Sequence, residues 1–215
     1  MNFCYPQAKL LIFTKAPFAG QVKTRLIPYL DEDAAARLQR QLIERTVAMA
    51  CESAVAPVEL WLSGDADHPC IEGLAYSHGL AVFPQRGSDL GKRMLGAMDA
   101  ALQSAESVVI IGTDSPAMDG AYLQQAFAAL EASDVVYGPA EDGGYTLVGM
   151  KQAWPELFTG IGWGGGEVLR QSLDQAAALG LRVASLGLGW DLDRPEDYER
   201  GLAGGWITGV GRDVE

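Results

Sequence analysis

Asp114 is the acidic residue whose sequence context best fits a catalytic or ligand-binding role. It follows the strand-like run 108–111, four β-branched residues typical of a strand buried on both faces. Pro116 disfavours helical angles at Ser115, so the Asp114 carboxylate is expected in a short turn beyond the strand. Open parallel sheets bind their ligands at that edge, so Ser115 is also expected to contact the bound cofactor or nucleotide. A plain turn-forming role for Asp114 is the alternative.

Basic residues follow the first expected strand. Residues 1–30 contain no Asp or Glu, although the chain has a net charge of −12. Lys15, Lys23 and Arg25 lie in the loop after that strand, and Gly20 lets the backbone turn closely around a ligand. We therefore expect a phosphate-binding loop. It matches neither GxxxxGK[ST] nor GxGxxG, and a cluster on a solvated face is the alternative.

A second glycine-bearing segment, 85–94, also joins an expected strand to an expected helix. Gly91 and Arg93 belong to it, and we expect both to help complete a nucleotide pocket. Ser88 and Asp89 are ordinary helix caps, so a capped surface helix is an equally good interpretation of this segment.

Two further features have the chemistry to contact a sugar. Gly143 and Gly144 allow close approach of a ligand, and the carboxylate of Asp142 beside them can accept hydrogen bonds from hydroxyls. A simple hairpin turn would explain the same residues. Trp163 precedes three glycines and could stack on a sugar or a base, an ordinary packing contact being the alternative.

Asp191 and Asp193 are two residues apart, so both would point to one face of an extended segment. Their oxygens suit Mg²⁺ or Mn²⁺, especially where a diphosphate supplies the remaining ligands. A second interpretation makes Asp193 the cap of the last helix, with Glu196 completing a capping box.

Expected strands and helices alternate over most of the chain, which predicts a mostly parallel sheet with helices on both faces. The strands are expected at 9–14, 58–62, 80–83, 108–111, 135–137, 145–150 and 181–186. Helices are expected after Asp31, after Ser88 or Asp89, after Asp119, over 167–179 and after the segment that begins at Trp190. Residues 63–69 are expected to form a loop, and the next segment is weakly patterned. The strand at 145–150 has no helix before it, which indicates an antiparallel member.

The composition of the 215 residues, 48% of them hydrophobic, predicts one α/β domain over 1–215, with 201–215 as a peripheral tail. The acidic balance argues against a general nucleic-acid binder. Three cysteines without CxxC spacing fit a reducing cytoplasm better than a disulfide or zinc framework. The apolar run 10–13 is too short to span a bilayer.

Several segments together resemble a known family. They are KAPFAGQVKTRL (15–26), GSDLGKRM (87–94), GTDSP (112–116), GPAEDGGYTLVG (138–149), WGGGEVL (163–169) and DLDRPEDY (191–198). In this order they resemble bacterial glycosyltransferases of the arsenosugar-biosynthesis type, within the GT-A nucleotide-diphospho-sugar transferase superfamily. The chain departs from the pattern in having one Asp instead of Asp-x-Asp, and in lacking Thr after the first glycine of WGGG.

The resemblance implies a Rossmann-like GT-A fold that binds a nucleotide at the strand ends. It implies that the basic loop holds phosphates through Lys15, Lys23 and Arg25. It also implies that Asp114 is a metal-binding acid, that Asp193 is a second one, and that Asp142 with its two glycines faces the sugar or acceptor. Asp114 and Asp142 are thus the candidate catalytic residues.

These features favour transfer of a sugar from a nucleotide diphosphate sugar to a small-molecule acceptor, assisted by Mg²⁺ or Mn²⁺. One alternative is a nucleotidyltransferase that releases pyrophosphate from a nucleoside triphosphate, because the KTRL segment also resembles phospholactate guanylyltransferases. Another alternative is a non-catalytic nucleotide-binding module.

Overall fold

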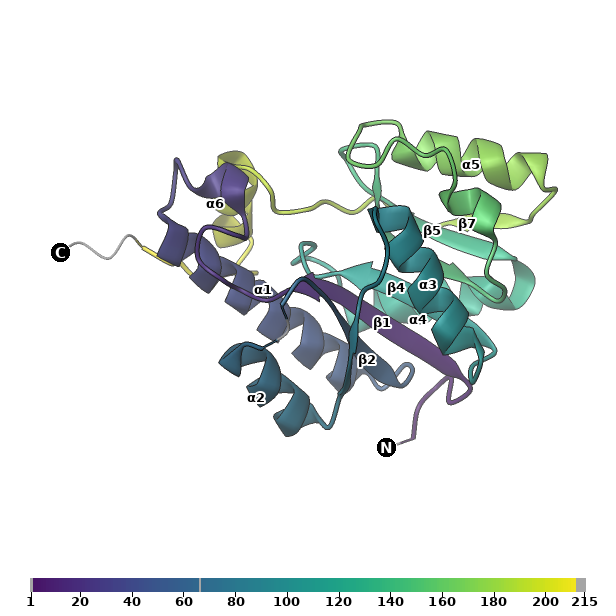
Figure 1. Ribbon diagram of the computed structural model, residues 1–215, viewed down its shortest axis with the longest axis horizontal. Coiled ribbons are helices and arrows are strands. Elements are labelled where there is room, and N and C mark those ends of the chain that lie inside the picture. Colours follow the sequence, from purple (N-terminus) through teal and green to yellow (C-terminus); the bar gives the residue numbers. More distant parts are fainter. Residues whose placement is uncertain (1, 66, 212–215) are drawn as a thin grey trace.

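The computed structural model describes residues 2–65 and 67–211, and these residues are organised around a seven-stranded sheet with the order β3-β2-β1-β4-β6-β5-β7. The strands are β1 (Ala8–Lys15), β2 (Val58–Ser63), β3 (Ala81–Pro84), β4 (Ser107–Gly112), β5 (Val135–Pro139), β6 (Tyr145–Met150) and β7 (Val183–Ser185). The sheet runs through the centre of the molecule (Figure 1).

β6 runs antiparallel to both of its neighbours, β4 and β5, whereas the other strand pairs are parallel. The antiparallel member predicted at 145–150 is therefore confirmed. The reason is that only a short loop joins β5 to β6, too short to hold the crossover that a parallel pair requires. β1 and β4 lie side by side, with Leu10 opposite Val109, so their carboxyl ends meet at one edge of the sheet.

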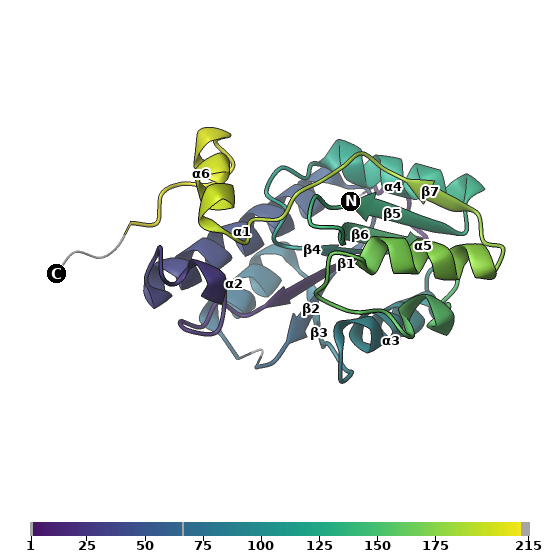
Figure 2. The same cartoon turned by 90° about the horizontal axis from the view of Figure 1, so that it is seen from above.

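The helices are α1 (Glu32–Ser53), α2 (Pro69–His78), α3 (Leu90–Leu102), α4 (Gly120–Ala132), α5 (Val168–Ala178) and α6 (Pro195–Ala203). Two short 3₁₀ turns, η1 (Thr24–Leu26) and η2 (Pro155–Phe158), complete the regular elements of the described residues. Helices α1, α2 and α4 pack on one face of the sheet, and α3 and α5 pack on the other, as Figure 2 shows for α3, α4 and α5. The predicted Rossmann-like α/β architecture is confirmed.

The alternation of side chains along β1 explains these two layers. Leu10 and Ile12 are buried against α1 and α4, whereas Leu11 and Phe13 are buried against α3. A strand of this kind must be apolar in both directions, which is why its sequence reads as a continuous hydrophobic run.

Helix α2 is the main departure from the expected elements, because the segment was expected to be loop and weakly patterned chain. Only Ile71 of this helix is buried, so it lacks the apolar stripe that marks most helices. Its ends nevertheless carry local signals: the ring of His68 accepts a hydrogen bond from the backbone of Cys70, Pro69 occupies the first turn, and Gly79 ends the helix in a left-handed conformation.

The start of α6 also differs from the expectation. Arg194 is the N-cap, and the carboxylate of Asp197 accepts hydrogen bonds from the backbone N–H groups of Asp193 (3.1 Å) and Arg194 (2.8 Å). The alternative interpretation, in which Asp193 caps this helix and Glu196 completes a capping box, is therefore wrong. Because Asp197 satisfies these donors, the Asp193 side chain is left to face another part of the molecule.

A third apolar cluster joins α6 to the loop after β1. Leu26 and Leu38 pack with Trp190, Ile207 and Val210 in this cluster. Figure 1 shows α6 beside the beginning of α1, at the end of the molecule remote from β7. The segment predicted to be a tail, 201–215, includes the end of α6 and the buried residues Ile207 and Val210. Residues 212–215 lie outside the described residues. None of the helices in the described part of the chain has the length and hydropathy of a membrane span.

Candidate functional site

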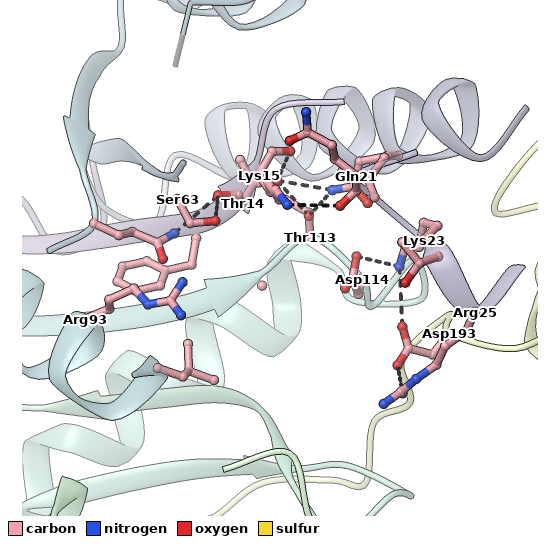
Figure 3. A pocket seen from close by; sticks show the side chains of 17 residues that line it. Thr14, Lys15, Gln21, Lys23, Arg25, Ser63, Arg93, Thr113, Asp114 and Asp193 are labelled. Carbon is pink, nitrogen blue, oxygen red and sulfur yellow. Dashed lines mark hydrogen bonds and ion pairs between the residues drawn. The ribbon is translucent and has the colours of Figure 1, made fainter. Parts of the chain in front are cut away.

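A cavity of about 550 Å³ opens at the carboxyl edge of the sheet (Figure 3). Lys15, Ser63 and Gly112, the last residues of β1, β2 and β4, all line it. The loop after β1 and the segment before α6 form further walls. The basic side chains of this lining are Lys15, Lys23, Arg25 and Arg93, and its acidic side chains are Asp114 and Asp193.

Lys23 lies at the centre of the charged groups. Its backbone is left-handed (φ 47°, ψ 38°), and its side chain is only 2% exposed. The ammonium lies 2.7 Å from Oδ1 of Asp114 and 4.0 Å from Oδ1 of Asp193, and it donates a 2.6 Å hydrogen bond to the carbonyl oxygen of Leu192. Figure 3 shows Lys23 between the two carboxylates. The lysine thus joins the first loop, β4 and the segment before α6.

Arg25 pairs with the second acid. Its Nη1 donates to Oδ2 of Asp193 at 2.7 Å, and both side chains are substantially exposed at the mouth of the cavity. The expected proximity of Asp114 and Asp193 is therefore present in the structure, but a cation accompanies each carboxylate.

Asp191 has a different environment from Asp193. It is partly buried, does not line the cavity, and accepts a 2.5 Å hydrogen bond from the hydroxyl of Ser115. Burial raises the pKa of Asp191 to about 6, and the negative charges of Asp114 and Asp142 act in the same direction. Asp191 therefore lies outside the cavity that Asp114 and Asp193 line, but it is close enough to Asp114 for the two carboxyl groups to interact electrostatically.

Polar side chains that sequence reasoning missed form the floor of the cavity. Nε2 of Gln39 donates to the hydroxyls of Thr14 and Thr113, at 3.3 Å in each case, and these two hydroxyls are 3.1 Å apart. All three residues are buried. One signal was available, because Gln39 interrupts the apolar stripe of α1 at a position that faces the sheet.

Gln85 is another residue that sequence reasoning missed. Its Nε2 donates to the backbone carbonyls of Trp61 (2.9 Å) and Thr14 (3.3 Å), so it ties the end of β3 to β1 and β2. Lys15 and Arg93 lie at the rim, where they donate to the backbone carbonyls of Gln21 and Asp89 respectively. In the described residues neither of these two bases forms an ion pair with a carboxylate.

Other residues predicted to bind a ligand make packing contacts within the protein. A Cβ added to Gly91 would lie 2.5 Å from the ring of Trp163, which also stacks on Phe158 with ring centroids 6.4 Å apart. A Cβ on Gly143 would lie 1.9 Å from the carbonyl oxygen of Gly166. Packing therefore explains why glycine stands at positions 91 and 143. The ligand-binding roles of both glycines remain predictions.

The remaining predicted residues, Gly20, Asp142 and Gly144, do not line the cavity. Gly20 has a positive φ of 71°, as the turn of the basic loop requires. Oδ1 of Asp142 accepts a 2.8 Å hydrogen bond from the backbone of Gly144, which fixes this carboxylate within its own loop. Their roles toward a ligand are likewise predictions.

The donor set at the cavity fits a divalent cation only when other ligands accompany it. Residues 2–65 and 67–211 contain no group of three or more His, Cys, Asp and Glu placed to hold a metal ion. Asp114 and Asp193 offer two carboxylates, and Mg²⁺ or Mn²⁺ commonly takes one or two carboxylates together with phosphate oxygens. The pair therefore suits a cation bound jointly with a phosphorylated ligand.

Comparison with solved structures supports the fold. A candidate nucleotide-diphospho-sugar transferase from Desulfovibrio desulfuricans G20 is 32% identical, with a TM-score of 0.78 over 88% of this chain and 83% of that chain. A CMP:2-keto-3-deoxy-manno-octonic acid synthetase complexed with CTP is 13% identical, with a TM-score of 0.55 over 94% of this chain and 100% of that one.

Glucosyl-3-phosphoglycerate synthase from Mycobacterium tuberculosis, in complex with Mn²⁺, UDP and glucosyl-3-phosphoglycerate, is 15% identical. Its TM-score is 0.54 over 92% of this chain and 76% of that chain. At such low identities the second and third likenesses establish the fold alone. None of the curated proteins matches the chain in sequence.

A family model also matches residues 46–165, which include β4 with its acid turn and the Gly-Gly loop. The arsenosugar-type subfamily remains a prediction. With this match over more than half of its length and the 32% identical relative, the chain belongs to the DUF2064 family, described as an uncharacterised protein conserved in bacteria.

Proposed function

We propose that this protein transfers a sugar from a nucleotide diphosphate sugar to a small-molecule acceptor. The observation that carries the proposal is the cavity at the carboxyl edge of β1 and β4, where four basic side chains and the two acids Asp114 and Asp193 form one lining. The 32% identical relative, named as a candidate nucleotide-diphospho-sugar transferase, supports the same chemistry. The volume of about 550 Å³ lies within the range of small-ligand pockets, roughly 300–1,000 Å³.

Lys15 and Arg93 are the residues that would first bind the phosphates. Both hydrogen-bond to backbone carbonyls, so their charges remain available to an anion. Lys23 and Arg25 already compensate carboxylates and would add to the positive potential around the diphosphate. Arg93 can bind two phosphate oxygens at once, which would also fix the orientation of the ligand.

Asp114 and Asp193 would hold a divalent cation together with the phosphates. When bound, such a cation supplies positive charge against the departing diphosphate. The chain itself positions the two carboxylates, because Leu192 between Asp191 and Asp193 is anchored to the backbone of Asp114. The cluster of buried hydroxyls below them, Thr14 and Thr113, holds the ends of β1 and β4 at a fixed distance.

In this proposal the acceptor binds beside Asp142. The negative charge of this exposed carboxylate contributes to raising the pKa of Asp191, so Asp142 lies near the segment that precedes α6. Oδ1 is held by the backbone of Gly144, while the other oxygen can accept a hydrogen bond from a sugar or acceptor hydroxyl.

A nucleotidyltransferase is the second candidate, favoured by the fold shared with a synthetase that binds CTP. The two reactions differ in what leaves the nucleotide. Sugar transfer releases a nucleoside diphosphate from a nucleotide sugar, whereas nucleotidyl transfer releases pyrophosphate from a nucleoside triphosphate.

The test has a binding stage and a product stage. Thermal unfolding is measured with nucleoside diphosphates, nucleotide sugars and triphosphates, each with and without Mn²⁺, since a ligand at 100 times its Kd adds about 2.7 kcal/mol of stability. Ligands that stabilise the protein are then incubated with an acceptor panel, and diphosphate and pyrophosphate are quantified. We expect stabilisation by a nucleotide sugar and release of its diphosphate. Pyrophosphate release would favour the second candidate, and stabilisation by none of these ligands would reject both.

A further inference from the structure

Each of the two acids of the cavity has a cationic partner within the protein. Lys23 pairs with Asp114 at 2.7 Å, and Arg25 pairs with Asp193 at 2.7 Å. The four side chains together carry no net charge. The Lys23 ammonium also lies 4.0 Å from Asp193, so it occupies the space between the two carboxylates where a shared cation would bind.

Lys23 is held in this position more firmly than an ordinary surface lysine. Its side chain is 2% exposed, and the ammonium donates a 2.6 Å hydrogen bond to the carbonyl of Leu192 in addition to its ion pair with Asp114. Its backbone is left-handed, and the carbonyl of Lys23 accepts a 2.8 Å hydrogen bond from the backbone of Leu26, which is itself fully buried. Arg25, by contrast, is 63% exposed and can move away from Asp193 at little cost.

This arrangement works against a divalent cation that arrives alone. Such an ion would meet the fixed charge of Lys23 at the distance of direct contact, and repulsion between like charges is strong where water is excluded. A diphosphate changes the balance, because it brings negative charge and oxygen ligands that can face both cations. The groups packed behind the pair, Asp191 and Ser115, contribute a hydrogen-bonded carboxyl rather than a further cation.

We propose that Lys23 is a tethered counter-ion that keeps divalent metal away from Asp114 and Asp193 until a nucleotide diphosphate enters the cavity. The role of the diphosphate rests on the proposed function, whereas the exclusion of free metal by Lys23 does not. Lys23 acts here as a positioning residue for the charges of the site.

The test measures Mn²⁺ binding to the full chain without nucleotide, by loss of the free-ion signal in electron paramagnetic resonance. Lys23→Met removes the tethered charge while preserving most of the volume. We expect Mn²⁺ to bind at least tenfold more tightly to Lys23→Met than to the unmodified protein. The double variant Lys23→Met/Asp114→Asn should lose this gain, because the gain depends on the uncompensated carboxylate.

Lys9→Met is the matched control. Lys9 also forms a 2.7 Å ion pair, with Glu59, but it lies near the beginning of β1, at the opposite end of this strand from the cavity. This variant should bind Mn²⁺ as the unmodified protein does. If Lys23→Met fails to fold, as judged by circular dichroism, Lys23→Gln can still donate to Leu192 and should show the same gain.

Unchanged or weaker Mn²⁺ binding in folded Lys23→Met or Lys23→Gln would overturn the proposal. Failure of both neutral variants to fold would also overturn it, since Lys23 would then be required for the structure itself. A separate titration adds nucleoside diphosphates to the unmodified protein. If none of them strengthens Mn²⁺ binding, the proposed function fails, while the comparison of the lysine variants still decides the role of Lys23.

Discussion

The backbone N–H of Leu192 donates a 2.8 Å hydrogen bond to the carbonyl oxygen of Asp114. This bond fastens the segment before α6 to the carboxyl end of β4. The adjacent bond from Ser115 to Asp191 fastens the same two segments a second time. Asp193 is thereby held beside Asp114, and the acid pair on which the proposed chemistry depends is a product of this junction.

Asp114→Asn should remove metal-supported nucleotide binding and turnover. The substitution preserves the shape of the side chain but removes the charge that faces Lys23 and the proposed cation. We expect kcat/KM to fall roughly 10²-fold, as on the loss of a single electrostatic contact to a transition state. Asp99→Asn, on the exposed side of α3, is the control and should retain activity. Equal activity in Asp114→Asn would remove this residue from the site.

Arg93→Gln should weaken nucleotide binding by about tenfold, since one charge-assisted contact to phosphate is worth about 1.4 kcal/mol or more. The measurement is the Kd of the nucleoside diphosphate that stabilises the protein, at low and high salt. The Kd should also depend less on salt concentration in Arg93→Gln than in the unmodified protein. Lys92→Gln is a close control, because Lys92 is the neighbouring base on α3 but does not line the cavity. A similar loss in both variants would indicate a general effect of surface charge.

Stability should depend on pH through Asp191. The folded protein holds its proton with a pKa of about 6, compared with an ordinary value of 3.8. Between these values the folded state binds more protons than the unfolded state, so the free energy of unfolding must fall as pH rises from about 4 to 6. A difference of about two units corresponds to on the order of 3 kcal/mol.

Urea unfolding at pH 4.5 and at pH 7.5 measures this dependence. Asp191→Asn should be less sensitive to the change than the unmodified protein, because the amide does not titrate. Asp99→Asn should keep the full dependence. If Asp191→Asn responds to pH as strongly as the unmodified protein does, the change arises from other groups.

Gly143→Ala should destabilise the fold by about 3 kcal/mol or more, because the added methyl group would overlap the backbone of Gly166. Gly160→Ala separates this collision from backbone strain. Gly160 has a similar positive φ of 73°, but no atom lies within 4 Å of an added Cβ. Gly160→Ala should therefore lower the free energy of unfolding by only about 1–2 kcal/mol, the cost of the left-handed backbone. Urea unfolding compares the two. Equal losses would show that the Gly166 loop yields to the methyl group.

The sequence by itself determined the strands, the α-helices other than α2, and the edge of the sheet where the site lies. The β-branched run 108–111 could pack only as a buried strand, and Asp31, Asp89 and Asp119 cap helices where their sequences predict. These features depend on the periodicity of nearby residues, so a short window of sequence is enough to define them. The basic loop and Asp114 could be placed at one edge because parallel strands end together.

Only the tertiary structure decided which charges meet. No local pattern pairs Lys23 with Asp114, since the contact depends on the apolar cluster that brings Leu26, Trp190 and Ile207 together. The same holds for Gln39, whose hydrogen bonds to Thr14 and Thr113 require α1 to pack across two strand ends. Local periodicity determines the elements of this protein, but the packing of distant segments determines its site, because each ion pair there joins residues from separate parts of the chain.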